Sequence, residues 1–125
     1  MAERFENQST KLSSANSVTD VYTPVNFNSS DDRAVLLSVL AANSDGSSAV
    51  DVSLFVTATG STSTTVATVE AEGTSYYLAK TITVPADASL EFVANKVILK
   101  QGQKLRAYAS AASDCEITVS SLEIY

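Results

Sequence analysis

The sequence has no histidine, no tryptophan, one cysteine, four glycines and two prolines among its 125 residues. Without histidine, the chain lacks the base that most often activates a nucleophile, and it cannot form the Cys/His sets that hold structural zinc. The single cysteine, Cys115, excludes a disulfide within the chain. Its acidic neighbours, Asp114 and Glu116, disfavour a thiolate, so we expect an inert thiol.

Long apolar runs and basic stripes are also absent. The longest apolar run, residues 34–42, is interrupted by Ser38 and is too short to cross a bilayer, and the polar first residues show no secretory leader. Eight basic residues against fourteen acidic ones give a net charge of −6, without the basic surface that phosphates require. We therefore expect no membrane or nucleic-acid partner, and synthesis in a cytosol.

The acidic residues form no convincing catalytic or metal site. Glu70 and Glu72 would share one face of a strand about 7 Å apart, a spacing that overlaps that of an inverting glycosidase pair. No aromatic or polar residues mark a sugar cleft around them, so a solvated strand end is the better interpretation. A calcium loop over residues 41–52 fails because Ala41 and Val52 occupy ligand positions. We expect no catalytic residue, no metal and no cofactor.

The residues that are present favour β-structure. Ser and Thr make up about a quarter of the chain, and apolar residues at every second position over 50–58 indicate a half-buried antiparallel strand. The most apolar strand covers residues 34–42, and both of its faces are predicted to be covered. One face carries Val35, Leu37, Val39 and Ala41, and the other carries Leu36 and Leu40. In the last strand the inward positions shift between Val119 and Leu122, which predicts a β-bulge at residues 120–121.

Short strands separated by turns, with no stretch of helical periodicity, predict an all-β fold. After a turn at residues 60–64, for example, the chain is expected to return in a strand at residues 65–69. We expect an antiparallel two-sheet β-sandwich or jelly roll of about eight strands over residues 18–125. Residues 1–17, which are polar and lack periodicity, are expected to form an extended N-terminal arm.

Five segments carry a recognisable order of strand-and-turn motifs. They are VYTP at residues 21–24, RAVLLSVLAANSDGS at 33–47, YYLAKTITVP at 76–85, KVILKQGQKL at 96–105 and SSLEI at 120–124. In this order they resemble small virion structural proteins of tailed bacteriophages, especially those that infect cyanobacteria. The resemblance implies a β-sandwich without catalytic residues that decorates or cements a capsid, or that belongs to the neck, tail or fibres.

On this resemblance we expect a non-enzymatic capsid decoration or cement protein that stabilises the head lattice of a virion assembled in the host cytoplasm. Its partners would be copies of itself, as a dimer or trimer, and a major capsid or other virion protein. A neck, tail or fibre component is one alternative, and a carbohydrate-binding module that uses Tyr76, Tyr77 or Tyr108 is another. The candidate interface residues are Phe5, Leu12, Leu36, Leu40, Phe55, Tyr76 and Tyr77.

Overall fold

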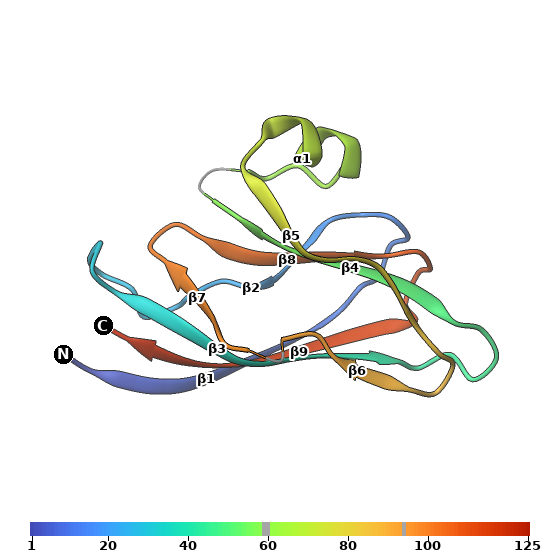
Figure 1. The fold of residues 1–125 in the computed structure, drawn as a ribbon, viewed down its shortest axis with the longest axis horizontal. Coiled ribbons are helices and arrows are strands. Elements are labelled where there is room, and N and C mark those ends of the chain that lie inside the picture. Colours follow the sequence, from blue (N-terminus) through green and yellow to red (C-terminus); the bar gives the residue numbers. More distant parts are fainter. Residues whose placement is uncertain (59–60, 94) are drawn as a thin grey trace.

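The computed structural model of the chain describes residues 1–58, 61–93 and 95–125. Two antiparallel sheets pack face to face, and one short helix lies outside them (Figure 1). The predicted all-β sandwich of two antiparallel sheets is therefore confirmed, and the described residues form nine strands.

The two sheets divide the strands unequally. The five-stranded sheet, at the bottom of Figure 1, contains β1 (Glu3–Lys11), β9 (Cys115–Ile124), β3 (Arg33–Asn43), β6 (Ser89–Glu91) and β7 (Val97–Lys100). Its order is β1-β9-β3-β6, with β7 paired to the other end of β3. The four-stranded sheet has the order β2-β8-β4-β5 and contains β2 (Thr19–Tyr22), β8 (Lys104–Ala109), β4 (Val50–Thr57) and β5 (Ser75–Val84).

The hydrophobic core fills the space between the sheets. Alternate residues of each strand point inward, as the pleat requires. Fully buried members of this core are Leu36, Leu54, Leu99, Leu105 and Ile117. Both sheets thus contribute large aliphatic side chains to one shared interior.

The inward face of β3 changes register in the middle of the strand. Leu36 pairs with Ser121 and Ser38 with Ser120, so Leu37 is an extra residue without a partner in β9. Such a bulge turns the following side chains by one position. The inward residues are consequently Ala34, Leu36, Val39 and Ala41. The prediction that Val35 and Leu37 share a face with Val39 was therefore wrong.

The last strand, β9, has no bulge at residues 120–121, where we predicted one. Its inward alternation continues unbroken from Val119 to Ser121 and Glu123, which are all buried. Leu122 and Ile124 therefore point to the outer face of the five-stranded sheet. The irregularity that the sequence indicated exists, but it lies opposite, in β3.

Helix α1 (Val66–Glu72) occupies part of the segment where we predicted a returning strand, which was wrong. The helix has only seven residues, too few for a helical period to be evident in the sequence. Gly73 ends it with a left-handed φ of 72°, a conformation that glycine adopts at low cost. Val69 packs with Val18 and Phe55 against the outer face of the four-stranded sheet. Gly60, where we expected the preceding turn to begin, lies outside the described residues.

The N-terminal segment, for which we expected an extended arm over residues 1–17, is extended but docked. From Glu3 to Lys11 it pairs residue by residue with β9. Leu12 then enters the core and is fully buried. Most of this segment belongs to the sandwich, because it adds an edge strand to the five-stranded sheet by pairing with β9.

Candidate functional site

Glu70 and Glu72 do not form a carboxylate pair. They lie on the helix α1, where a separation of two residues places side chains on different sides. Glu70 accepts a hydrogen bond from the Tyr77 hydroxyl at 2.9 Å, whereas Glu72 accepts one from Ser61 at 2.6 Å. Within the described residues, no group of three or more His, Cys, Asp or Glu side chains is placed to hold a metal ion. No helix there is long and apolar enough to span a bilayer.

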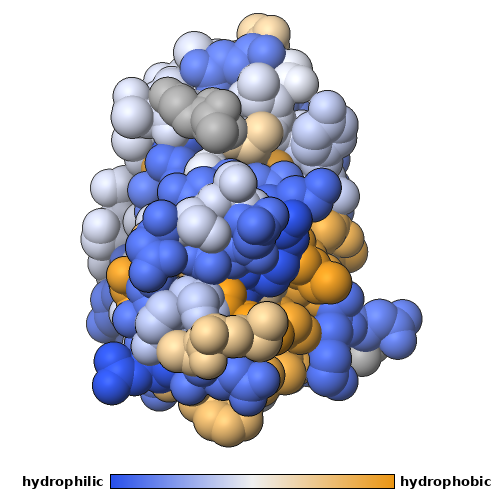
Figure 2. All heavy atoms as spheres, turned by 90° about the vertical axis from the view of Figure 1, so that its left-hand side faces the viewer, coloured by the Kyte–Doolittle hydropathy of each residue, from blue (hydrophilic) through white to orange (hydrophobic). Residues whose placement is uncertain are grey.

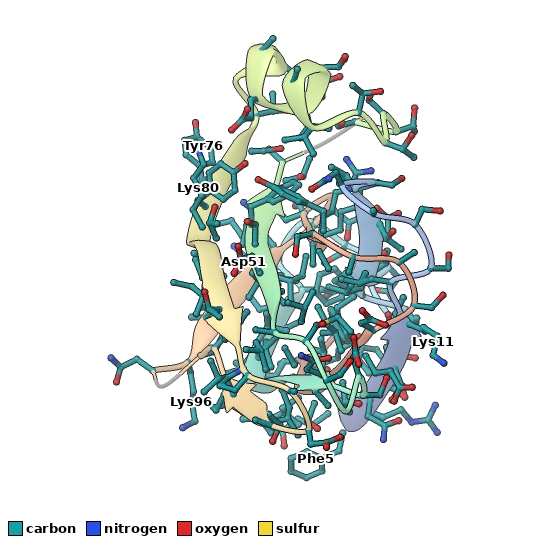
Figure 3. All side chains as sticks on the ribbon, turned by 90° about the vertical axis from the view of Figure 1, so that its right-hand side faces the viewer. Phe5, Lys11, Asp51, Tyr76, Lys80 and Lys96 are labelled. Carbon is teal, nitrogen blue, oxygen red and sulfur yellow. The ribbon has the colours of Figure 1, made fainter. Side chains whose placement is uncertain are left out.

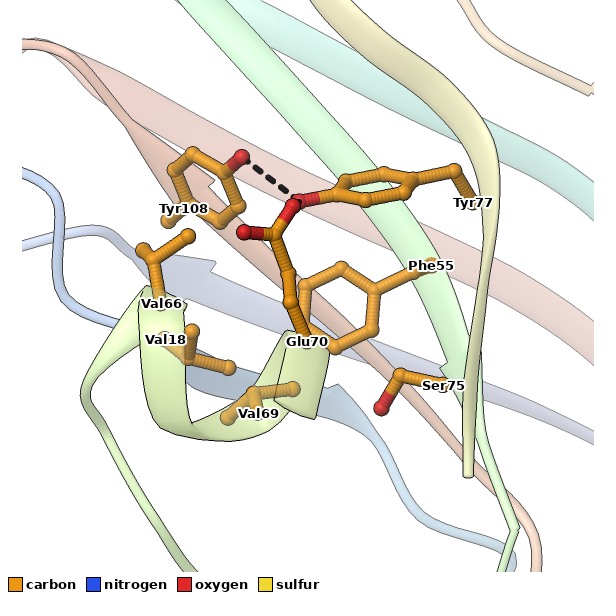
Figure 4. Close-up of a pocket in the computed structure, with 8 residues that line it drawn as sticks. All are labelled: Val18, Phe55, Val66, Val69, Glu70, Ser75, Tyr77 and Tyr108. Atoms are coloured by element: carbon orange, nitrogen blue, oxygen red, sulfur yellow. Dashed lines mark hydrogen bonds between the residues drawn. The ribbon is translucent and has the colours of Figure 1, made fainter. Parts of the chain in front are cut away.

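Tyr77 and Tyr108 meet beneath α1 on the outer face of the four-stranded sheet (Figure 4). Their hydroxyl oxygens are 2.8 Å apart, and the ring of Phe55 packs edge-on against Tyr77 with centroids 5.5 Å apart. Burial, together with hydrogen bonds to Tyr108 and Glu70, raises the pKa of Tyr77. The remaining cavity of about 10 Å³ holds no more than one water molecule. These tyrosines are packed against the protein and do not form a platform for a sugar.

Glu123 is a fully buried carboxylate that sequence reasoning missed. It accepts hydrogen bonds from the Tyr22 hydroxyl, from the backbone N–H of Val25 at 3.2 Å and from the backbone N–H of Asn26 at 2.9 Å. Ser121 Oγ lies 2.6 Å from the Tyr22 hydroxyl oxygen. Burial and the nearby carboxylate raise the pKa of Tyr22, so the phenol stays a donor. Since Tyr22 and Glu123 belong to different sheets, the cluster ties the sandwich together.

Arg106 is another buried charged side chain, with 2 % of its surface exposed. Its Nε donates to Asp20 at 2.7 Å, and its Nη2 donates to the carbonyl of Ser63 at 2.7 Å. The guanidinium thus fixes the segment before α1 to the four-stranded sheet. Like Glu123, it has its hydrogen-bonding partners within the chain, and its role is structural.

Cys115 is fully buried in the core. Burial, and to a lesser extent the charge of Glu116, raises the pKa of its thiol to about 11. The thiol is therefore protonated at neutral pH and shielded from other molecules.

We expect Cys115 to remain unlabelled by a thiol reagent at pH 8 in the native protein and to be labelled fully in denaturant. Because the folded thiol holds its proton more tightly than the unfolded one, its contribution to stability falls as pH rises from 9.0 to about 11. Titration with a chromogenic disulfide reagent measures the first effect, and urea unfolding of wild type and Cys115→Ala across that pH range measures the second. Native labelling at the rate of an exposed thiol would contradict this.

Three of the seven candidate interface residues are unavailable to a partner. Leu12 and Leu36 are fully buried, and Phe55 is 2 % exposed beneath α1. The bulge in β3 turns Leu36 inward, and the helix that we did not predict covers Phe55. Sequence alternation alone could not reveal either cause. The remaining candidates reach the surface: Phe5, Leu40 and Tyr76 are exposed, and Tyr77 is partly buried.

Two long strands have a free edge. Among the described residues, β1 pairs only with β9, and β5 pairs only with β4. β1 lies beside β2 at one margin of the sandwich, whereas β5 forms the opposite margin of its sheet, three strands away from β2. The free N–H and C=O groups of such edges are templates for pairing with another strand.

The β5 edge is also apolar. Tyr76 is 67 % exposed, and Leu78 and Ile82 are each 40 % exposed. Figure 3 shows Tyr76 and Lys80 along this margin of the sandwich. Lys80 is the only charged side chain on β5, so the strand has little of the charge by which natural proteins discourage edge pairing.

Comparison with known proteins finds a likeness of fold. No family model matches the sequence, and no curated protein matches it significantly. Among solved structures, the chain matches a subunit of the disulfide-linked pili that form Bacillus endospore appendages, with a TM-score of 0.50 and 16% sequence identity. The match covers 96% of this chain and 86% of that chain. It is a likeness of fold over nearly the full length.

This finding overturns the resemblance to phage virion proteins. The expected capsid decoration, the capsid partner and the location in a virion are corrected with it, because the fold matches a pilus subunit. The motifs misled because each is a strand followed by a turn, and unrelated β-sandwiches share that pattern. The fibre component that we kept as an alternative is nearer to the finding.

Proposed function

We propose that this chain is a non-enzymatic structural subunit that assembles with copies of itself into a fibre. The observation that carries the proposal is the pair of long free edges, β1 and β5, on opposite margins of the sandwich. They have nine and ten residues, and because the register of β5 shifts twice between Tyr77 and Ile82 we expect pairing along its regular parts on either side of these shifts. The likeness to a pilus subunit supports this function.

Pairing of β1 with β5 of another copy produces an open assembly. The two edges are different surfaces of the same chain, so each copy keeps one free edge after one contact has formed. Such head-to-tail contacts continue as a filament unless the rotation between copies closes a ring. Main-chain hydrogen bonds give the contact its affinity, and burial of exposed side chains such as Tyr76 and Leu78 adds to it.

The fibre is held together without disulfides between copies. The matched pili are disulfide-linked, whereas the one cysteine of this chain is buried in its core. Hydrogen bonds and apolar contacts must then supply the cohesion. We place the fibre outside the cell, as an appendage, and not in a phage particle.

We expect the purified full chain to form filaments visible by negative-stain electron microscopy, in equal amount with and without dithiothreitol. Leu78→Lys, which puts a second lysine on the β5 edge, should lower the pelletable fraction at least about tenfold. Leu40→Lys is the matched control, because Leu40 is 39 % exposed and lies on β3, which is paired with other strands on both sides. Circular dichroism checks that both variants are folded. Equal fibre yield from both variants, or fibres lost on reduction, would contradict the proposal.

A further inference from the structure

The outer face of the five-stranded sheet carries a row of apolar side chains across four strands. Phe5 on β1 pairs with Leu122 on β9, Leu122 with Val35 on β3, and Val35 with Ile98 on β7. We call these four residues the apolar row. Phe5 is 74 % exposed and Ile98 is 58 % exposed. Figure 3 shows Phe5 pointing away from the sandwich. Figure 2 views the end of the molecule that is on the left in Figure 1, and its apolar side chains gather in the lower half, mainly on the right.

A charged row lies beside the apolar row, towards the chain termini. It runs from Glu3 through Ile124 and Arg33 to Lys100. Its acidic end is therefore on β1, and its basic end is on β3 and β7. Arg33 and Lys100 are directly opposite each other on the neighbouring strands β3 and β7, where like charges repel. The Arg33 guanidinium donates to the carbonyl groups of Ser30 and Asp32. Within the described residues, none of the three charged side chains of this row forms an ion pair.

We infer that this face binds the same face of a second copy, about a two-fold axis parallel to the strands. With that axis, β1 of one copy lies over β7 of the other and β9 lies over β3. Each row of residues lies over the same row of the second copy. Glu3 then lies over Lys100 of the second copy, Phe5 over Ile98, and Leu122 over Val35. The basic end of the charged row, on β7 of one copy, then meets the acidic end, on β1 of the other copy.

A two-fold axis across the strands, through Asn7, also brings opposite charges together, because it places Glu3 over Lys11 of the second copy. It would, however, place the apolar Phe5 and Leu122 over the polar Ser9 and Thr118, so the apolar row favours the first arrangement.

The surface beside the apolar row also fits this arrangement. A hollow over Ser120 is lined by Phe5, Asn7 and Leu37. It exists because Ser120 is small and its neighbours on both sides are larger. The same two-fold axis places β3 of the second copy over β9, so the partner's Leu37 lies above Ser120 and can fill the hollow. The surface is therefore complementary to itself in shape, and in charge where Glu3 meets Lys100, while Arg33 lies over Ile124 of the second copy.

The size of the face sets the expected affinity. Four strands at a spacing of about 4.8 Å, over five rows of outward residues, give roughly 500 Å² per copy. Two such faces bury about 1,000 Å², the lower end of specific interfaces. We expect a dissociation constant in the micromolar range. The contact does not use the free edges of β1 and β5, so it can also join neighbouring filaments of the proposed fibre.

The test is sedimentation velocity of the full chain after any fibres have been removed by centrifugation. We expect a monomer–dimer equilibrium for the wild type. Glu3→Lys alone and Lys100→Glu alone should each weaken the dimer about tenfold, since symmetry produces each charge contact twice. The double variant should recover to within about threefold of wild type. Ile98→Ser should weaken the dimer at least about thirtyfold, whereas the control Ile82→Ser, on β5, should leave it unchanged.

The face-to-face dimer and the proposed fibre can be disproved separately. The wild-type supernatant is also examined at a protein concentration of about 100 μM, which is 100-fold above a dissociation constant of about 1 μM. If the protein is still monomeric there, the face-to-face pair is overturned, even if fibres have formed. A dimer that is insensitive to Ile98→Ser, or a double charge variant that stays as weak as the singles, also overturns it. Dimers that follow the predicted pattern in protein that never forms fibres support the pair and contradict the fibre.

Discussion

Glu123→Ala is expected to lower the free energy of unfolding by about 4 kcal/mol. The carboxylate is fully buried and accepts hydrogen bonds from Tyr22, Val25 and Asn26. Its removal leaves the backbone N–H groups of Val25 and Asn26 without this acceptor, leaves Ser121 as the one remaining partner of the Tyr22 phenol, and opens a cavity in the interior. Because domains are stable by only about 5–15 kcal/mol, the variant should be close to unfolding at 37 °C.

Urea unfolding followed by circular dichroism measures this loss. Glu116→Ala is the matched control, since Glu116 lies on the same strand, faces solvent and forms only a surface salt bridge with Lys11 at 3.4 Å. We expect a change of less than about 1 kcal/mol for the control. Glu123→Gln keeps the shape but places an amide NH₂ among donors, and about half the loss of Glu123→Ala should appear. A Glu123→Ala variant as stable as the control would show that the cluster does not hold the sheets together.

Leu36→Ala is expected to cost about 3 kcal/mol, while Leu40→Ala costs less than about 1 kcal/mol. Both leucines lie on β3, but the bulge between Leu36 and Ser38 separates them. Leu36 is fully buried in the core, and Leu40 is 39 % exposed on the outer face. The two substitutions remove the same atoms, so only their different environments can separate the outcomes.

The same urea unfolding experiment compares the two leucine variants. Equal losses would mean that Leu36 and Leu40 share one face, as a strand without the bulge requires. Loss of stability in Leu40→Ala but not in Leu36→Ala would mean that the register of β3 is reversed. Either result would also remove the basis for placing Val35 in the apolar row.

The fold class could be predicted because period-two alternation is strong in β4 and because turns separate short strands throughout. The register within β3 and β9 could not. We predicted a bulge in β9 because it would bring the apolar Leu122 and Ile124 to the inward face after Val119, which leaves Glu123 outside, as is usual for a carboxylate. The structure shows the opposite: Tyr22 and two backbone N–H groups make Glu123 acceptable inside, and Leu122 is left outside.

Only part of the surfaces proposed for assembly could be predicted from the sequence. Phe5 and Tyr76 could be named from the sequence, because aromatic residues in polar surroundings suggest a contact. The free edges could not, because an edge is defined by which strands fail to pair, and strand order does not follow from alternation. The apolar row was hidden for a similar reason: Leu122, Val35 and Ile98 come together only once the register of three strands is known.

A cryo-electron microscopy map of the assembled full chain, at a resolution that separates strands, tests the proposed function most directly. We expect a fibre in which β1 of each copy lies beside β5 of the next, about 4.8 Å away, so that sheets run continuously from copy to copy. No density should connect Cys115 residues of different copies. A map in which β1 and β5 both face solvent, or discrete particles where a fibre is expected, would contradict this.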